Sequence, residues 1–183
     1  RGLGWWPVPV MAPKAKVPPW VNLAKMLPAS NSQQDGAARK ELWTRMDFNG
    51  NGYLSLAEVD KALLAVWQLK SGDEFATKKC QPAIMRAFQA AKDASGDEDG
   101  MHGDYVTKGE FRLLLVYLQR YCELLAVFEE IDTGDDRRLD VDEFKKAMPK
   151  LREWKVRIKD PVAEFGSIDK NGGGTILFDE FAG

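Results

Sequence analysis

The chain has 183 residues, of which 44% are hydrophobic and 30% are charged, as is typical of a soluble globular protein with a hydrophobic core. It contains no apolar run near the ~20 residues that span a bilayer, and no secretory signal is visible, so a membrane-spanning protein is excluded. The net charge of −2 conceals an asymmetry, because residues 1–34 hold four basic and no acidic side chains.

Residues 1–34 are predicted to form an extended N-terminal arm. Six of the nine prolines lie within residues 7–28, and Trp5, Trp6 and Trp20 lie beside them. Proline at this density breaks helices, because it fixes φ and has no amide proton, and it favours a polyproline-like chain. Met11-Ala12 resembles a natural start, which would make residues 1–10 a leader, a tag or a gene-model artefact.

From about Gln33, amphipathic helices alternate with loops rich in Gly, Asp and Asn, and the loops recur as a repeat. Three loops begin with an aspartate, and a fourth, distorted loop ends at Glu110. Apolar residues keep the same places around the loops: on the incoming helix (Leu42, Phe128, Phe165), at the central β-like position (Leu54, Val106, Leu139, Ile176) and after the closing glutamate (Val59, Phe111, Phe144, Phe181). The pattern predicts an all-α fold of two pairs of EF-hand helix–loop–helix units, in residues 35–117 and 118–183, with the last helix truncated.

The first loop, DFNGNGYLSLAE (47–58), carries every ligand of a Ca²⁺-binding EF-hand loop. Such loops supply oxygens from positions 1, 3, 5, 7, 9 and 12, with a glycine at the turn of position 6. These ligands are Asp47, Asn49, Asn51, the Tyr53 carbonyl, Ser55 and Glu58, and Gly52 is at the turn. We therefore expect this loop to be the best calcium site. Only two of its side-chain ligands are charged, which predicts a moderate affinity.

The last loop, DKNGGGTILFDE (169–180), retains part of the ligand set, namely Asp169, Asn171, the Thr175 carbonyl and Glu180. Gly173 and Leu177 replace the ligands of positions 5 and 9. Weak calcium binding and a metal-free structural loop are both compatible with this pattern.

The third loop, DTGDDRRLDVDE (132–143), has four acids at ligand positions, namely Asp132, Asp136, Asp140 and Glu143. Gly134 removes the ligand of position 3, and Arg137 replaces the turn glycine, which predicts a strained backbone. A structural role is favoured over calcium binding.

The second loop is not predicted to bind an ion. If the incoming helix ends near Ala91, the segment up to Glu110 is too long, and the alternative register places Met101 and Gly103 at ligand positions. His102, the only histidine, has no second His or Cys beside it for zinc. We expect this unit to serve as a pairing partner, with Val106 forming a β-bridge to Leu54.

Cys80 and Cys122 are far apart in sequence, and Cys122 lies within an apolar helical run. Both are interpreted as reduced thiols, which indicates a cytoplasmic protein.

Three stretches together resemble the calflagins, flagellar calcium-binding proteins first known from trypanosomes: EFRLLLVYLQRYCELLAVFEEID (110–132), EFKKAMPKLREW (143–154) and SIDKNGGGTILFDEF (167–181). The similarity covers about residues 36–181. It implies a two-lobed EF-hand protein of a motile cilium or flagellum, and related EF-hand proteins bind inside axonemal doublet microtubules. Calflagins reach the flagellar membrane through an acylated N-terminus, whereas neither Arg1-Gly2 nor Met11-Ala12 fits the myristoylation pattern, so membrane association is not expected.

The favoured function is a calcium-binding structural component of the axoneme, whose acid-free arm docks onto an acidic partner such as the tubulin lattice. The arm could instead fold back on its own lobes or be disordered. Alternative functions are a calcium sensor that binds target helices or the flagellar membrane, and a regulatory EF-hand fragment of a larger protein. The sequence contains no nucleophile–base pair, phosphate loop or zinc motif, so neither enzymatic activity nor a nucleic-acid partner is expected.

Overall fold

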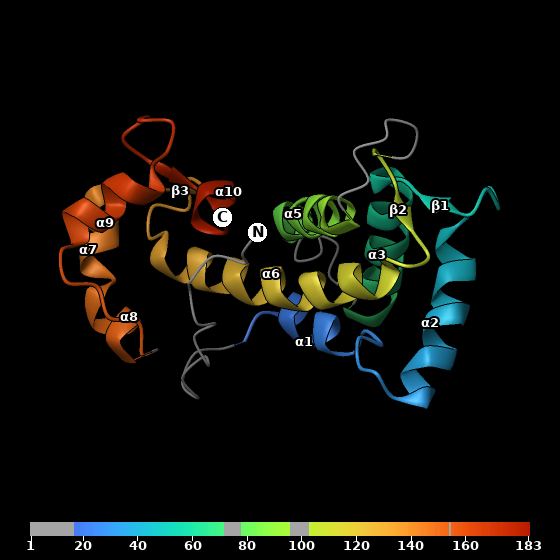
Figure 1. The fold of residues 1–183 in the computed structure, drawn as a ribbon. Coiled ribbons are helices and arrows are strands. Elements are labelled where there is room, and N and C mark those ends of the chain that lie inside the picture. The colour runs from blue at the N-terminus through green and yellow to red at the C-terminus, as the bar shows by residue number, and fades with distance from the viewer. Residues whose placement is uncertain (1–16, 72–77, 96–102, 154) are drawn as a thin grey trace. The chain divides into compact units, whose positions relative to one another are not determined.

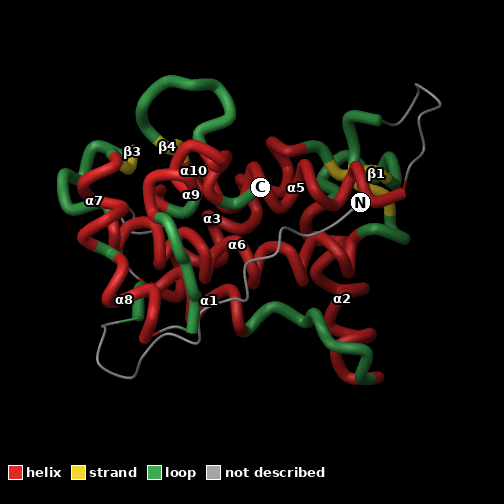
Figure 2. The backbone as a smooth tube through the Cα atoms, turned by 60° about the vertical axis from the view of Figure 1, so that its left-hand side comes forward, coloured by secondary structure: helices red, strands yellow, loops and turns green. Residues whose placement is uncertain are grey.

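The computed structural model describes residues 17–71, 78–95, 103–153 and 155–183 (Figure 1). This part of the chain is mostly helical, with two short pairs of antiparallel strands (Figure 2). The all-α EF-hand prediction is therefore confirmed. Backbone contacts group Pro18–Cys122 and Glu123–Gly183 into two compact units, and the boundary lies inside one continuous helix, α6 (Phe111–Ile131).

The first unit contains, in chain order, α1 (Pro19–Lys25), α2 (Gln33–Met46), β1 (Tyr53–Leu54), α3 (Leu56–Ser71), α5 (Gln81–Lys92), the short 3₁₀ helix η1 (Asp93–Ser95) and β2 (Val106–Thr107). The second unit contains β3 (Arg138–Leu139), α7 (Val141–Lys146), α8 (Met148–Glu153), α9 (Pro161–Ile168), β4 (Ile176–Leu177) and α10 (Phe178–Phe181). None of the described helices is long and apolar enough to cross a membrane.

The prediction of an extended arm is wrong for residues 18–34. Pro19 lies in the first turn of α1. Amides of the first turn have no acceptor within the helix, so the lack of an amide proton costs nothing there, and the fixed φ of proline suits a helix. Trp20 is buried, with 6% of its surface exposed. The segment after α1 is held by α6, because Gln119 donates to the Leu27 carbonyl at 3.3 Å and Arg112 Nε donates to the Ala29 carbonyl at 3.1 Å.

Residues 18–34 thus fold back on the first unit, as the alternative prediction stated. The remainder of the predicted arm, residues 1–16 with Trp5 and Trp6, lies outside the described residues.

The two loops of the first unit pair through β1 and β2, with Tyr53 opposite Thr107 and Leu54 opposite Val106. Leu54 and Val106 are fully buried, so the predicted bridge between them is confirmed. On the first incoming helix, the predicted core residue Leu42 is partly exposed. The neighbouring Trp43 is buried in its place. Trp43 meets Phe111 edge to face, with 5.1 Å between ring centroids.

The second unit repeats this construction around β3 and β4, with Arg138 opposite Leu177 and Leu139 opposite Ile176. Phe128 packs edge to face against Phe178 and Phe181, at centroid distances of 5.7 and 5.5 Å. The apolar positions identified from the repeat therefore form the core of this unit.

Both cysteines are buried and neither forms a disulfide. The burial of Cys122 was predicted from its apolar helical run. Burial raises the pKa of Cys80 to about 12. The neutral thiol is favoured because the surrounding protein solvates a thiolate poorly.

Candidate metal centre

The first loop is positioned by α2 and α3. Helix α2 ends at Met46, and Asp47 follows as its C-cap residue. The Asp47 carboxylate turns into the loop, where Oδ1 accepts from the Asn51 amide and Oδ2 from the Gly52 amide, both at 3.1 Å. Asn51 Oδ1 in turn accepts from the Tyr53 amide at 2.9 Å. Loop amides thus fix the oxygens of positions 1 and 5.

The end of the loop is closed by Glu58. Its Oε2 accepts from the Ser55 amide at 2.9 Å and from the Ser55 hydroxyl at 2.7 Å, while Ser55 Oγ accepts from the Glu58 amide at 3.3 Å. This reciprocal pattern is a capping box at the start of α3. Asn49 Nδ2 donates to Glu58 Oε1 at 3.1 Å, which brings the side chains of positions 3 and 12 into contact across the loop.

The donor set of this loop suits calcium. Every ligand position offers an oxygen, and Ca²⁺ takes six to eight oxygen ligands from carboxylates, carbonyls and waters. The side chains at positions 1, 3 and 12 already lie around one short loop, since Asp47 and Asn49 share the Asn51 amide and Asn49 meets Glu58. The residues present therefore fit the ion, and their role as ligands stays a prediction.

The last loop repeats several internal hydrogen bonds of the first. Asp169 accepts from the amides of Gly173 and Gly174 at 3.0 and 2.9 Å, and Asn171 Nδ2 donates to Glu180 Oε1 at 2.7 Å. A Cβ added at Gly173 would lie 2.5 Å from Asn171 Oδ1, so the missing position 5 side chain leaves space that the Asn171 amide occupies. Thr175 lies just before β4, and its carbonyl role is likewise still a prediction.

In the third loop, the four acids are held by backbone amides. Asp132 accepts from the Arg137 amide at 2.8 Å, and Asp136 accepts from the Arg138 amide at 2.9 Å. Asp140 and Glu143 form the capping box of α7.

The third loop has no side-chain ligand at position 3, and backbone and side-chain donors next to that position bind Glu143. Glu143 Oε1 accepts from the Gly134 amide at 2.9 Å and from the Thr133 hydroxyl at 3.0 Å. Within the described ranges, no group of three or more His, Cys, Asp and Glu side chains could hold a metal ion. The structural role of this loop stays a prediction.

The turn position of these loops requires a left-handed backbone. Gly52 and Gly174 have φ of 84° and 76°, and Arg137, at the same position of the third loop, has φ of 64°. The predicted strain at Arg137 is confirmed, because side chains with a Cβ are disfavoured in this region.

The second loop provides pairing but no described ligand cluster. Glu110 is buried and accepts from the Thr107 amide at 2.8 Å and hydroxyl at 2.9 Å, which closes the loop behind β2. Its helix α5 ends at Lys92, close to the predicted end at Ala91. Met101 and His102 lie outside the described residues.

Sequence reasoning missed one group of residues, the cationic side chains of α2 and of the start of α6. The available signal was the helical spacing of Lys40, Trp43 and Thr44, which places these three side chains on one face of α2. The residues that face them lie more than sixty positions later in the chain.

Comparison with known proteins gives the following similarities. The sequence matches the family described as the FCaBP EF-hand domain over residues 23–118, a region that begins within α1. It is 37% identical over 165 residues to the flagellar calcium-binding protein of Trypanosoma cruzi, covering 89% of this chain and 76% of that protein. It is 36% identical over 164 residues to flagellar calcium-binding protein TB-24 of Trypanosoma brucei brucei, covering 89% and 73%. A solved homolog of programmed cell death 6 protein from Leishmania major Friedlin covers 88% of this chain and 76% of that chain, with a TM-score of 0.42 at 20% identity.

Proposed function

The chain belongs to the family of flagellar calcium-binding proteins, and from this premise we propose that it is a calcium-binding structural component of a flagellar or ciliary axoneme. The two relatives compared above carry calcium binding and the flagellum in their names. Those names describe no enzyme, and no enzymatic role is proposed here.

The observation that carries the calcium proposal is the first loop. Its ligand positions are complete, and the side chains of Asp47, Asn49 and Glu58 lie within one network of hydrogen bonds. Calcium would be held by these side chains together with Asn51, Ser55 and the Tyr53 carbonyl. The ion would supply positive charge that links α2 to α3 through the carboxylates of Asp47 and Glu58.

A structural role is favoured over a switching role by the way the loops are paired. Loop 47–58 pairs through β1 and β2 with the loop that ends at Glu110, which supplies Val106 and Thr107 to the bridge. A pair with one complete loop cannot gain cooperativity from two ions. Sensors of the calmodulin type also expose a methionine-rich groove. Here Met46 and Met148 are buried, and of the described methionines only Met26 and Met85 are exposed.

Trp20 is buried within its own unit, so it is not proposed as a contact with the axoneme. The acid-free residues 1–16 remain a proposed contact with an acidic, microtubule-like partner.

Co-sedimentation with demembranated axonemes and with purified microtubules tests this proposal. We expect the full chain to pellet with axonemes both in calcium and in EGTA, because a structural component stays bound while calcium adjusts its stability. A matched chain without residues 1–16 should pellet less. A chain that stays in the supernatant under both conditions would contradict axonemal association, and binding that requires calcium throughout would favour the sensor alternative.

A further inference from the structure

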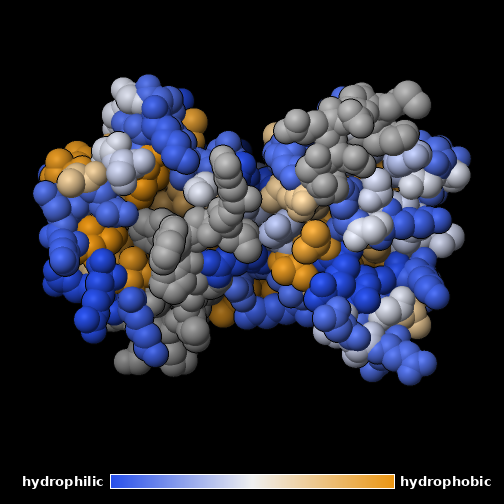
Figure 3. Space-filling model, viewed as in Figure 1, coloured by the Kyte–Doolittle hydropathy of each residue, from blue (hydrophilic) through white to orange (hydrophobic). Residues whose placement is uncertain are grey.

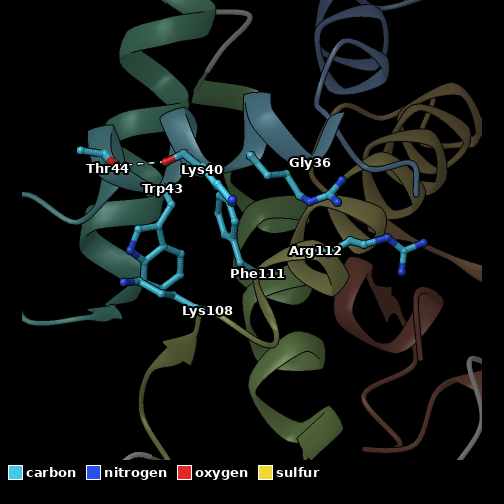
Figure 4. Close-up of a pocket in the computed structure, with 8 residues that line it drawn as sticks. Gly36, Lys40, Trp43, Thr44, Lys108, Phe111 and Arg112 are labelled. Atoms are coloured by element: carbon cyan, nitrogen blue, oxygen red, sulfur yellow. Dashed lines mark hydrogen bonds between the residues drawn. The ribbon is translucent and has the colours of Figure 1, made fainter. Parts of the chain in front are cut away.

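A pocket of about 570 Å³ lies in the first unit between α2 and the start of α6 (Figure 4). Its volume is within the range of ligand-binding clefts. The pocket is lined by Gly36, Arg39, Lys40, Trp43, Thr44, Lys108, Phe111 and Arg112. It is separate from the calcium ligands, none of which lines it.

The charged residues that line this pocket are all positive, and the carboxylate of Asp35, which is not a lining residue, interacts electrostatically with Arg39. Four of its eight lining residues are Lys or Arg, and none is Asp or Glu. In the chain as a whole the acidic residues outnumber the basic ones by 28 to 26, so this concentration is a local feature. The side of the molecule that carries α2 is largely hydrophilic in Figure 3.

The two arginines already have structural roles. Arg39 Nη1 donates to the carbonyls of Pro28 and Ser30 at 2.9 and 2.6 Å, and Arg112 Nε donates to the Ala29 carbonyl at 3.1 Å. Each guanidinium keeps further N–H groups for a ligand, because arginine carries five donors.

The two lysines of the pocket carry positive charge that no described carboxylate neutralises. Lys40 and Lys108 are exposed, and neither forms an ion pair with any carboxylate of the described residues. Lys108 Nζ lies 5.7 Å from the centroid of the Trp43 ring, and Figure 4 shows its ammonium beside the indole. A cation over an aromatic ring retains its affinity for an anion.

The remaining hydrogen-bonding capacity of the pocket is almost all of the donor type. Trp43 Nε1 is buried and has no acceptor within the described part of the chain. The Thr44 hydroxyl donates to the Lys40 carbonyl at 3.0 Å, and its oxygen is the one side-chain acceptor among the lining residues. A ligand that complements the pocket must therefore bring negative charge and acceptor oxygens.

We propose that this pocket binds an acidic peptide segment of another protein. Figure 4 shows Lys108 and Arg112 extending in opposite directions from Phe111. The charges of Lys108 and Arg112 thus lie apart along the pocket, while Arg39 and Arg112 both reach the carbonyls of residues 28–30. Charge distributed in this way matches carboxylates carried by successive side chains. One compact phosphate group would need convergent donors.

The aromatic floor argues for a peptide over a membrane surface. Trp43 and Phe111 expose only 6% and 3% of their surfaces. A membrane-binding surface inserts exposed apolar side chains between lipids, and these two rings are held in the core by their edge-to-face contact. The proposal goes beyond the axonemal function, since it needs neither calcium nor microtubules.

The test is a fluorescence-anisotropy titration of a labelled glutamate-rich peptide with the full chain in EGTA. We expect saturable binding that weakens as the salt concentration rises. Lys40→Glu and Lys108→Glu should each weaken binding roughly tenfold, because the reversed charge repels the peptide. Both side chains are exposed, so folding should be unaffected, which circular dichroism checks.

The matched control is Lys61→Glu, which makes the same charge change on α3 away from the pocket and should alter binding less than about twofold. The proposal is overturned if the peptide does not bind, if Lys61→Glu weakens binding as much as the pocket variants do, or if a glutamine-rich peptide binds equally well. It is also overturned if inorganic phosphate displaces the peptide at low millimolar concentration, or if phosphatidylserine vesicles bind with the same lysine dependence while the peptide does not.

Discussion

The left-handed turn of the loops provides the sharpest test of the local structure. Gly52 and Arg137 occupy equivalent positions with φ of 84° and 64°. Gly52→Ala adds a Cβ to a backbone that disfavours one, and Arg137→Gly removes a Cβ from such a backbone. A Cβ at Gly52 would meet no heavy atom within 4 Å, so the substitution tests backbone strain without a steric clash.

The magnitudes follow from two opposing terms. A Cβ in the left-handed region destabilises the folded state by about 1–2 kcal/mol. Alanine also has less conformational entropy than glycine in the unfolded chain, which stabilises the folded state by about 0.4–1 kcal/mol. Gly52→Ala should therefore lower the free energy of unfolding by about 0.5–1 kcal/mol. Arg137→Gly should raise it by a similar amount, since its amide can still donate to Asp132.

The assay is urea unfolding in EGTA, followed by tryptophan fluorescence and far-UV circular dichroism. Gly166→Ala is the control, because Gly166 lies inside α9 with open space around it and is not among the positive-φ glycines. It should stabilise the chain by about 0.5–1 kcal/mol. If Gly52→Ala stabilises the protein as Gly166→Ala does, the assigned turn conformation is refuted.

Two further predictions concern buried side chains. Trp20→Ala should lower the free energy of unfolding by about 3–5 kcal/mol in urea titrations, since α1 buries this ring in the first unit; a change near zero would mean that α1 does not pack there. The raised pKa of Cys80, about 12 against 9.0 for a free thiol, stabilises the fold below pH 9, and this contribution is lost as pH rises from 9 toward 12. The difference in unfolding free energy between wild type and Cys80→Ala should therefore shift against wild type over that range, and a constant difference would contradict the burial of the thiol.

The repeat pattern predicted the core because EF-hand units impose fixed positions on apolar residues. Leu54 and Val106 could be paired from their places relative to the closing glutamates alone, and the structure has this register. The strain at Arg137 was also predictable, because the loop geometry fixes the backbone at that position whatever side chain it bears.

Other features depended on tertiary contacts that no local pattern contains. The prolines before Trp20 were interpreted as helix breakers, whereas Pro19 begins α1 and the helix is stabilised by burial against residues far along the chain. The cationic pocket joins residues 36–44 to residues 108–112, and only the folded chain brings them together.

Isothermal titration calorimetry of wild type, Glu58→Gln and Glu143→Gln with Ca²⁺ is the direct test of calcium binding by the first loop. Glu58→Gln replaces the carboxylate that closes the complete loop, and Glu143→Gln makes the same change in the loop that has Gly134 at ligand position 3. We predict that the tightest binding event is lost in Glu58→Gln and retained in Glu143→Gln. If the tightest event survives in Glu58→Gln, the first loop is not the principal calcium site and the account is contradicted.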